Sequence, residues 1–255
     1  MIRCENLTAG YGKRQILKDI TWEAETGKLT VVVGPNGCGK STLLKSFMGQ
    51  TAVWGGGLYL DGRPVSAWSP RETARRVSYV PQSRNDVSLS VSRMVLHGRF
   101  PYIVYPRHYT AEDYRKVEWA LEKTGISGLG DCLMSELSGG EKQKAYLSMA
   151  LAQDAPVMIL DEPTTYLDIS CQLELMELLK GLTEEGKTVI AVLHDLAQGL
   201  TYGDRMLVME RGEKAAYGTP EEIFESGQLD RVFGLKIHAG THGQGGRHYW
   251  FEHRK

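Results

Sequence analysis

The sequence has no long hydrophobic run, no closely paired cysteines and no excess of either charge. No apolar stretch approaches the roughly 20 residues of a membrane helix, and the first residues lack a signal-peptide core. The cysteines Cys4, Cys38, Cys132 and Cys171 are scattered, which argues against a disulfide framework or a zinc site. Thirty basic and thirty-one acidic residues argue against a broad nucleic-acid-binding face. We therefore expect a soluble cytosolic protein that binds no nucleic acid and reaches a membrane only through a partner.

Buried strands alternate with helices along the 255 residues, of which 42% are apolar. Leu29 to Val33 is a continuous apolar and β-branched run, which is typical of a strand buried on both faces. Residues 157–160 and 188–193 have the same character. Between them, one apolar helix face ends near Gly186 and is formed by Leu175, Met176, Leu179 and Leu182. Strand, helix and strand at this spacing predict a parallel, doubly wound sheet.

Shorter patterns predict further elements. Residues 20–24 alternate like a half-buried strand, and residues 58–60 lead into an Asp-Gly turn. Apolar residues at helical spacing predict a helix over residues 111–125, and residues 207–215 read as strand, turn and strand. The glycine-rich segment after Gly234 matches no element.

A complete P-loop follows the first buried strand and precedes a helical segment. It matches G-x-x-x-x-G-K-[ST] and consists of Gly34, Pro35, Asn36, Gly37, Cys38, Gly39, Lys40, Ser41 and Thr42. Its glycines let backbone N–H groups turn toward an anion at the N-terminus of the next helix. Lys40 is expected to bridge the β- and γ-phosphates, and the Ser41 hydroxyl to hold Mg²⁺. By itself this motif predicts only that a nucleoside triphosphate binds.

Two carboxylates follow the apolar strand 157–160. Asp161 is expected to bind in the Mg²⁺ shell, and Glu162 is placed to polarise the attacking water as a general base. An Asp-Glu pair after a strand is usually a solvated turn, but the upstream P-loop favours the catalytic interpretation.

The segment 137–141, Leu-Ser-Gly-Gly-Glu, has two interpretations. Ser138 and Glu141 have the spacing of a capping box, which satisfies backbone donors at the start of a helix. A capping box does not explain Gly139 and Gly140, which weaken a helix and are useful where backbone approaches a ligand closely. We therefore predict a second phosphate site here, one that two chains arranged head to tail bring to each other's P-loop.

In combination these motifs make the sequence resemble an ATP-binding cassette (ABC) ATPase over essentially its whole length. The resemblance implies ATP and Mg²⁺ as cofactors and a homodimer in the ATP-bound state. It also implies that Tyr11 stacks on adenine and that Gln82 contacts Mg²⁺ and senses a transporter. It further implies that Asp168 crosses the dimer interface and that His194 contacts the γ-phosphate.

The resemblance implies an α/β fold of the P-loop NTPase type with a mostly parallel core sheet. We expect a single nucleotide-binding domain over residues 1–255. Its ATPase core, with an N-terminal antiparallel β subdomain, covers residues 1–82 and 152–230. An inserted α-helical subdomain covers residues 83–151, and a C-terminal extension covers residues 231–255.

The sequence departs from the usual family pattern at two places. Glu141 stands where glutamine is commonest, and since glutamate is a familiar variant we expect activity to survive. Thr165 and Tyr166 stand where small residues are frequent, which is expected to tune the dimer contact.

Segments outside these motifs resemble the ATPases of iron–siderophore, haem and vitamin B12 importers. One of them is the Gly-Arg-x-Pro segment within residues 91–102. This implies permease partners, indirectly a solute-binding protein, and a place on the cytoplasmic face of the cell membrane. The alternatives are an importer of another small solute such as zinc or manganese, or a non-transport cassette, for example in iron–sulfur cluster assembly.

Two segments each have two possible interpretations. The apolar residues 100–105 either form a groove for a short helix of a membrane partner or pack inside the helical subdomain. The C-terminal histidines form either a solvated tail, which we favour, or a metal sensor, and they are His238, His242, His248 and His253.

Overall fold

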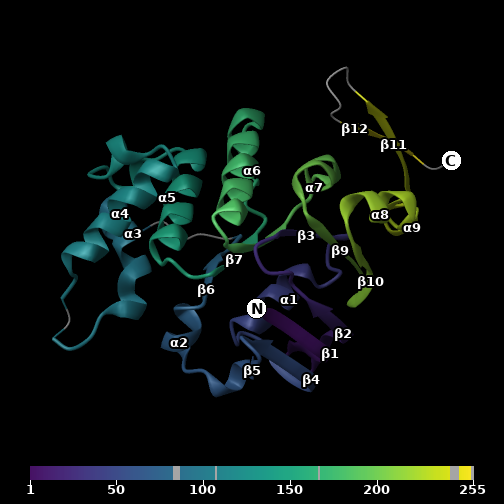
Figure 1. The fold of residues 1–255 in the computed structure, drawn as a ribbon, viewed down its shortest axis with the longest axis horizontal. Coiled ribbons are helices and arrows are strands. Elements are labelled where there is room, and N and C mark those ends of the chain that lie inside the picture. Colours follow the sequence, from purple (N-terminus) through teal and green to yellow (C-terminus); the bar gives the residue numbers. More distant parts are fainter. Residues whose placement is uncertain (83–86, 107, 166, 242–246, 254–255) are drawn as a thin grey trace. The chain divides into compact units, whose positions relative to one another are not determined.

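The computed structural model describes residues 1–82, 87–106, 108–165, 167–241 and 247–253 (Figure 1). They form two compact units: unit 1 comprises Met1–Ala67 and Thr183–Lys255, and unit 2 comprises Trp68–Leu182. The expected α/β fold is confirmed, with parallel strands flanked by helices and an N-terminal antiparallel sheet. The finer division into core, helical subdomain and extension stays a prediction.

Unit 1 begins with the antiparallel sheet, in the order β2-β1-β4-β5. Its strands are β1 (Ile2–Tyr11), β2 (Arg14–Glu23), β4 (Ala52–Leu60) and β5 (Arg63–Pro64). The expected Asp-Gly turn joins the last two, because Asp61 and Gly62 adopt φ of 51° and 76°. In β2, Ile20 and Trp22 are buried and their neighbours exposed, as the alternation predicts.

Parallel pairing in unit 1 is centred on β3 (Leu29–Val33). It pairs with β8 (Thr188–Val192) on one side and with β9 (Arg205–Glu210) on the other, while β10 (Glu213–Gly218) adds antiparallel to β9. Every residue of β3 and β8 is buried, which confirms the prediction for these apolar runs. Trp22 joins the two sheets through edge contacts with Phe47 of α1 (Lys40–Phe47) at 6.4 Å and Tyr217 of β10 at 6.2 Å.

The end of the chain folds where the sequence analysis assigned no element after Gly234, and the solvated tail favoured there is wrong for the described residues. Three short helices and a pair of strands complete unit 1: α7 (Leu196–Tyr202), α8 (Pro220–Glu225), α9 (Gln228–Phe233), β11 (Leu235–Thr241) and β12 (Arg247–His253). The strands are antiparallel, with Ile237 opposite Phe251 and His238 opposite Trp250. Ile237 is buried and Tyr249 packs on Phe224 of α8, so the strand pair has one packed face.

Unit 2 combines a parallel strand pair with helices. The strands are β6 (Val77–Val80) and β7 (Val157–Asp161), and the helices are α2 (Pro70–Ala74), α3 (Val91–Leu96), α4 (Ala111–Lys123), α5 (Gly139–Ala152) and α6 (Ile169–Glu184), which ends just past the boundary. Short 3₁₀ turns occur at Val65–Ala67 in unit 1 and at His97–Tyr102, Ser127–Leu129 and Met134–Glu136 in unit 2. Helices α3, α4 and α5 pack on one another.

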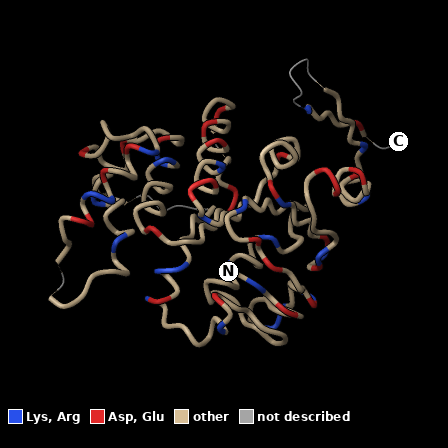
Figure 2. The backbone as a smooth tube through the Cα atoms, in the orientation of Figure 1, with Lys and Arg blue, Asp and Glu red and all other residues tan. Residues whose placement is uncertain are grey.

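Charged residues of both signs are interspersed along both units (Figure 2). Within the described part of the chain, no helix has the length and apolarity to cross a membrane.

Candidate functional site

The P-loop joins β3 to α1 in unit 1, and close contacts surround two of its glycines, Gly34 and Gly39. A Cβ on Gly34 would lie 2.2 Å from the carbonyl oxygen of Met209 and 2.7 Å from the Cys38 sulfur. Gly39 has φ of 107°, and a Cβ there would lie 2.9 Å from a methyl carbon of Leu17. Burial raises the pKa of the Cys38 thiol, so it packs as a neutral group. The loop is therefore held by its surroundings in unit 1.

Lys40 is the first residue of α1, and its side chain turns back over the loop. It is only 5% exposed, and its Nζ donates to the carbonyl oxygens of Gly34 at 2.6 Å and Pro35 at 3.2 Å. A buried ammonium needs such oxygen partners. No side chain caps the N-terminus of α1, because the cap residue is Gly39. The helix dipole therefore adds positive charge next to the Lys40 ammonium. The arrangement suits an anion such as phosphate.

Two other predicted residues of unit 1 have exposed side chains. Tyr11 ends β1 and is 44% exposed, so its ring is accessible for stacking. His194 follows β8 and is exposed as well. The neighbouring Asp195 is the cap of α7, because its Oδ1 accepts from the N–H groups of Ala197 at 2.8 Å and Gln198 at 3.2 Å. The contacts of Tyr11 and His194 with a nucleotide stay predictions.

The two predicted carboxylates lie at the end of β7 in unit 2, in different surroundings. Asp161 is 1% exposed and accepts a hydrogen bond from the Tyr79 hydroxyl at 3.1 Å. Glu162 is half-buried, has φ of 53°, and accepts from the side-chain amide of Gln82. The structure thus brings together Gln82 and Glu162, which are 80 positions apart. Tyr79 was not among the residues predicted from the sequence, although it lies in the strand that leads to Gln82.

The segment 137–141 caps helix α5, as one of its two interpretations required. The Ser138 hydroxyl accepts from the Glu141 N–H at 3.3 Å, and the Glu141 carboxylate accepts from the Ser138 N–H at 2.8 Å. The hydrogen bond from the Ser138 hydroxyl lowers the pKa of Glu141, so this carboxyl is an anion at neutral pH. The cap leaves Gly140 unexplained, since a Cβ there would meet only Leu167, at 3.6 Å. No contact described for Gly140 requires glycine at that position.

Asp168 lies close to this segment. An open pocket of about 520 Å³ in unit 2 is lined by Ser138, Gly139, Gly140, Glu141 and Asp168 among others. Asp168 also starts α6, because its Oδ1 accepts from the Cys171 N–H at 2.8 Å, and this bond lowers the pKa of Asp168. Sequence analysis did not foresee this capping role. Tyr166, the second departure from the family pattern, lies outside the described residues.

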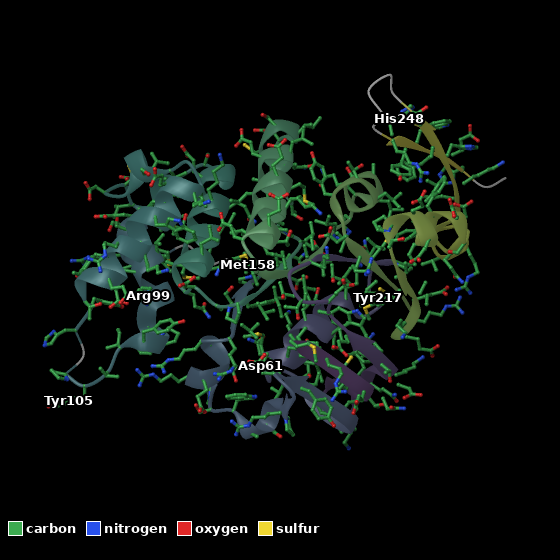
Figure 3. The ribbon with its side chains drawn as sticks, in the orientation of Figure 1. Asp61, Arg99, Tyr105, Met158, Tyr217 and His248 are labelled. Carbon is green, nitrogen blue, oxygen red and sulfur yellow. The ribbon has the colours of Figure 1, made fainter. Side chains whose placement is uncertain are left out.

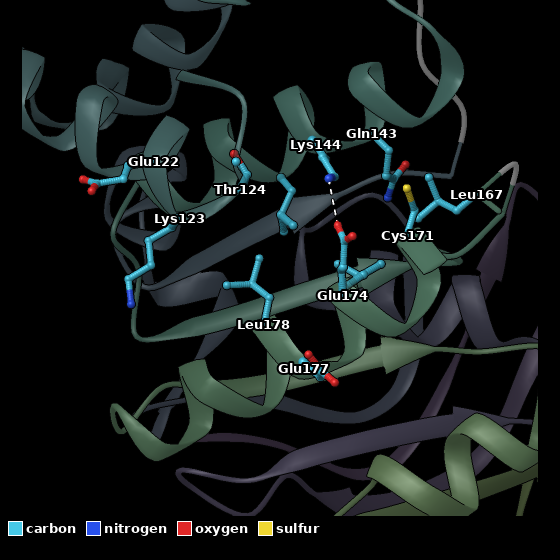
Figure 4. A pocket seen from close by; sticks show the side chains of 13 residues that line it. Glu122, Lys123, Thr124, Gln143, Lys144, Leu167, Cys171, Glu174, Glu177 and Leu178 are labelled. Atoms are coloured by element: carbon cyan, nitrogen blue, oxygen red, sulfur yellow. Dashed lines mark hydrogen bonds and ion pairs between the residues drawn. The ribbon is translucent and has the colours of Figure 1, made fainter. Parts of the chain in front are cut away.

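A second pocket, of about 360 Å³, lies between the end of α4 and helices α5 and α6 (Figure 4). Lys144 of α5 donates to Glu174 of α6 at 3.0 Å in its wall. None of the predicted ATP-binding residues lines it, but it shares Gly125, Lys144 and Cys171 with the pocket beside residues 138–141.

The two open segments resolve differently. In the apolar segment, Phe100, Val104 and Tyr105 are exposed to 62%, 64% and 93%, so they do not pack inside the helical region. Near the C-terminus, His238 and His248 stack on Trp250 with ring centroids 5.3 and 5.4 Å apart. The described residues include no group of three or more His, Cys, Asp or Glu placed to hold a metal ion, and His242 lies outside them.

Known proteins share this arrangement. The family model for the ABC transporter matches residues 17–165. The chain is 39% identical to the ferric enterobactin transport ATP-binding protein FepC of Escherichia coli, over 92% of this chain and 88% of the relative. It is 38% identical to the iron(3+)-hydroxamate import ATP-binding protein FhuC of Bacillus subtilis, over 90% of this chain and 86% of the relative.

Solved structures agree. A metal-chelate type ABC transporter in an inward-facing conformation matches with a TM-score of 0.85 at 24% identity, over 99% of this chain and 98% of the other, which supports the fold. The dimeric cassette MJ0796, bound to ADP and phosphate, matches with a TM-score of 0.75 at 26% identity, over 86% and 99%. The chain therefore belongs to the ABC transporter family, as an ATP-binding subunit that hydrolyses ATP.

Proposed function

We propose that this ATPase drives an importer of a metal chelate, such as an iron–siderophore complex or haem, or of cobalamin. The observation that carries the proposal is the similarity to FepC and FhuC over at least nine-tenths of the chain. The name of a third relative, the hemin import protein HmuV of Thermobifida fusca, widens the range of chelates beyond siderophores. The solute does not touch this chain, because the permease and a solute-binding protein select it.

The P-loop binds ATP through its backbone N–H groups and Lys40. The buried ammonium, now held by two carbonyl oxygens, turns to the β- and γ-phosphates. Ser41, Gln82 and Asp161 provide the oxygen ligands that Mg²⁺ prefers. Tyr79 supports this assignment, since its hydroxyl orients the nearly buried carboxylate of Asp161. When bound, the ion neutralises charge that develops on the phosphate oxygens.

Glu162 is the general base for the attacking water. Its hydrogen bond from Gln82 fixes the carboxylate, and the half-buried site keeps it accessible. His194 contacts the γ-phosphate, and Tyr11 stacks on the adenine ring. Because Gln82 bonds to Glu162, a partner that displaces Gln82 would release or reorient the base, which suits a sensor of the transporter.

The signature segment, residues 137–141, serves the ATP of a second copy. A partner's γ-phosphate can approach the N-terminus of α5, and Gly140 has no side chain to obstruct it. Asp168, in the same pocket, crosses to the partner. Two copies thus close head to tail around two ATP molecules.

A permease holds the subunit at the cytoplasmic face of the membrane. The exposed apolar segment supports this, because Phe100, Pro101 and Ile103 line a pocket of about 380 Å³ together with Pro70, Arg71 and Ala74. Such a surface suits a short apolar helix of the permease.

Co-purification from the native host tests the importer. A tagged Glu162→Gln variant is extracted from membranes in a mild detergent with ATP present, beside a tagged Lys40→Ala control. We expect a many-helix permease at one copy per ATPase with the first variant. Recovery of soluble partners alone, with no tagged protein in membranes, would favour the non-transport class.

A further inference from the structure

We propose that Arg99 is the positioning residue that fastens the exposed apolar segment, residues 100–105, to the C-terminal end of helix α5. This inference rests on the proposed function, in which a permease contacts that segment. It gives the Gly-Arg-x-Pro sequence a mechanical role: movement of the segment moves the helix whose other end is the signature segment.

Arg99 is a charged side chain inside unit 2, with partners from three directions. It is 5% exposed, its Nε donates to Oδ1 of Asp113 at 2.8 Å, and its Nη1 donates to the carbonyl oxygen of Ala152 at 2.9 Å. Its guanidinium carbon lies 4.0 Å from the centre of the Tyr102 ring. A buried charge is stable only when it is paired in this way. The planar fork of arginine makes all three contacts at once, which a lysine cannot do.

The partners of Arg99 belong to elements that must move with it. Ala152 is the last residue of α5, and Asp113 is part of the capping box of α4, accepting from the Thr110 N–H at 2.8 Å. Gly98, the preceding residue, lies so close to α5 that a Cβ there would be 2.2 Å from the carbonyl oxygen of Met149. Arg99 therefore joins the apolar segment to both helices.

The backbone of the segment is also held by α2 and by Arg75, the residue that follows it. Arg71 and Arg75 donate to the Pro101 carbonyl oxygen at 2.7 and 2.9 Å, and the Arg75 guanidinium lies 5.2 Å from the centre of the Tyr102 ring. Tyr102 thus contacts two guanidinium groups, from Arg75 and Arg99. The backbone is fixed while the apolar side chains remain available to a partner.

Exposure changes sharply along the segment. Arg99 is buried among the helices of unit 2, whereas Tyr105 is 93% exposed at the tip of the loop (Figure 3). Phe100, next to Arg99, is 62% exposed. A permease helix that pushes on Phe100 therefore pushes on a chain whose preceding residue, Arg99, is bonded to α5 through its side chain.

The end of α5 is also tied to the strand that leads to Gln82. The side-chain amide of Gln153, which follows α5, donates to the Val77 carbonyl oxygen of β6 at 3.0 Å and to the Ala74 carbonyl oxygen. A displacement of the α5 end thus has a bonded route to β6 as well as to the signature segment. Coupling through such a chain of contacts has to be measured rather than assumed.

The test uses the full chain with Arg99→Lys, which keeps a positive charge beside Asp113 but gives up the fork that reaches Ala152. The matched control is Lys116→Met, which breaks the half-buried pair of Lys116 with Asp154 between α4 and the end of α5, at 2.7 Å. Hydrogen exchange is followed in the isolated protein. We expect residues 98–103 to exchange about ten-fold faster in Arg99→Lys, the factor that one lost hydrogen bond to a charged group corresponds to, and unchanged in the control. Wild-type exchange in Arg99→Lys would overturn the fastening.

A second readout addresses coupling in the assembled complex with its permease in lipid vesicles. We expect Arg99→Lys to keep the ATPase rate of the isolated subunit within about two-fold while solute transported per ATP falls about ten-fold. An unchanged ratio, or an equal loss of isolated ATPase, would overturn the positioning role. If the wild-type protein neither binds a permease nor transports, the proposed function fails, and the exchange measurement still decides whether Arg99 fastens the segment.

Discussion

Lys40 and Glu162 carry opposite charges and have different surroundings. The Lys40 ammonium is nearly buried and held by two loop carbonyl oxygens, whereas the Glu162 carboxylate is half-buried and held by Gln82. The first arrangement suits a group that binds phosphate and the second a group that must reach water. We therefore assign ATP binding and water activation to different side chains, which substitutions can separate.

Replacing Lys40 with alanine removes the charge that faces the phosphates. We expect ATP hydrolysis to fall by about 100-fold or more, as for other single electrostatic groups at a reacting centre. Lys45→Ala, in the last turn of the same helix, is the control and should hydrolyse ATP normally. Near-normal hydrolysis by Lys40→Ala would contradict the site.

At the scale of elements, capped helix N-termini recur. Capping boxes begin α2, α4, α5 and α8, and they satisfy backbone donors without any ligand. Among these four boxes, only that of α5 has two glycines between the cap residue and the carboxylate. The extra feature is therefore the glycine pair, and its function is separable from that of the cap.

Gly140→Ala separates the two functions. The site has room for a Cβ, and alanine favours helix, so we expect the free energy of unfolding to stay equal or rise by up to about 0.5 kcal/mol. ATPase activity should nevertheless fall at least about ten-fold, because displaced reacting groups lose that much or more. Gly181→Ala, at an open position of α6, should change neither activity nor fold. Full ATPase activity in Gly140→Ala would contradict the proposal that a partner's nucleotide binds at the N-terminus of α5.

The cap of α8 gives a prediction for pH. The Thr219 backbone N–H lowers the pKa of Glu222 below its ordinary 4.5, so the folded state binds this proton more weakly than the unfolded state. Its stabilisation is present above the ordinary pKa and is lost as pH falls through the lowered one. In urea unfolding, Glu222→Gln should be less stable than the wild type at neutral pH and equally stable in strong acid. Glu225→Gln, on the same helix outside the box, is the control; a difference that persists unchanged in acid would contradict this account.

For the whole molecule, the sequence predicted elements whose patterns are local. The run from Leu29 to Val33 matches β3, and the helix expected over residues 111–125 is α4 at Ala111–Lys123. The strand pair β11–β12 was missed because its exposed face carries histidine and charged residues, and only Ile237 is deeply buried. The glycine-rich and polar sequence after Gly234 favoured a solvated tail.

The candidate site was predictable to the extent that it depends on motifs. Motif spacing alone predicted residues 34–42, 137–141 and 161–162 as members of the candidate site. Contacts between distant residues could not be read from the sequence, such as those of Glu162 with Gln82 and of Asp161 with Tyr79. The pairing of Arg99 with Asp113 could not be read from the sequence either, because a buried ion pair has no local sequence pattern.

The proposed mechanism depends most on two copies closing around ATP, and the molar mass of the Glu162→Gln variant tests this directly. This substitution keeps an amide that can bond to Gln82 but removes the base, so bound ATP should persist and hydrolysis should fall by about 100-fold or more. Light scattering after size exclusion should give twice the mass of one chain with ATP and Mg²⁺, and a single chain with ADP. A single chain under both conditions, at high protein concentration and with ATP shown to be bound, would contradict the head-to-tail dimer.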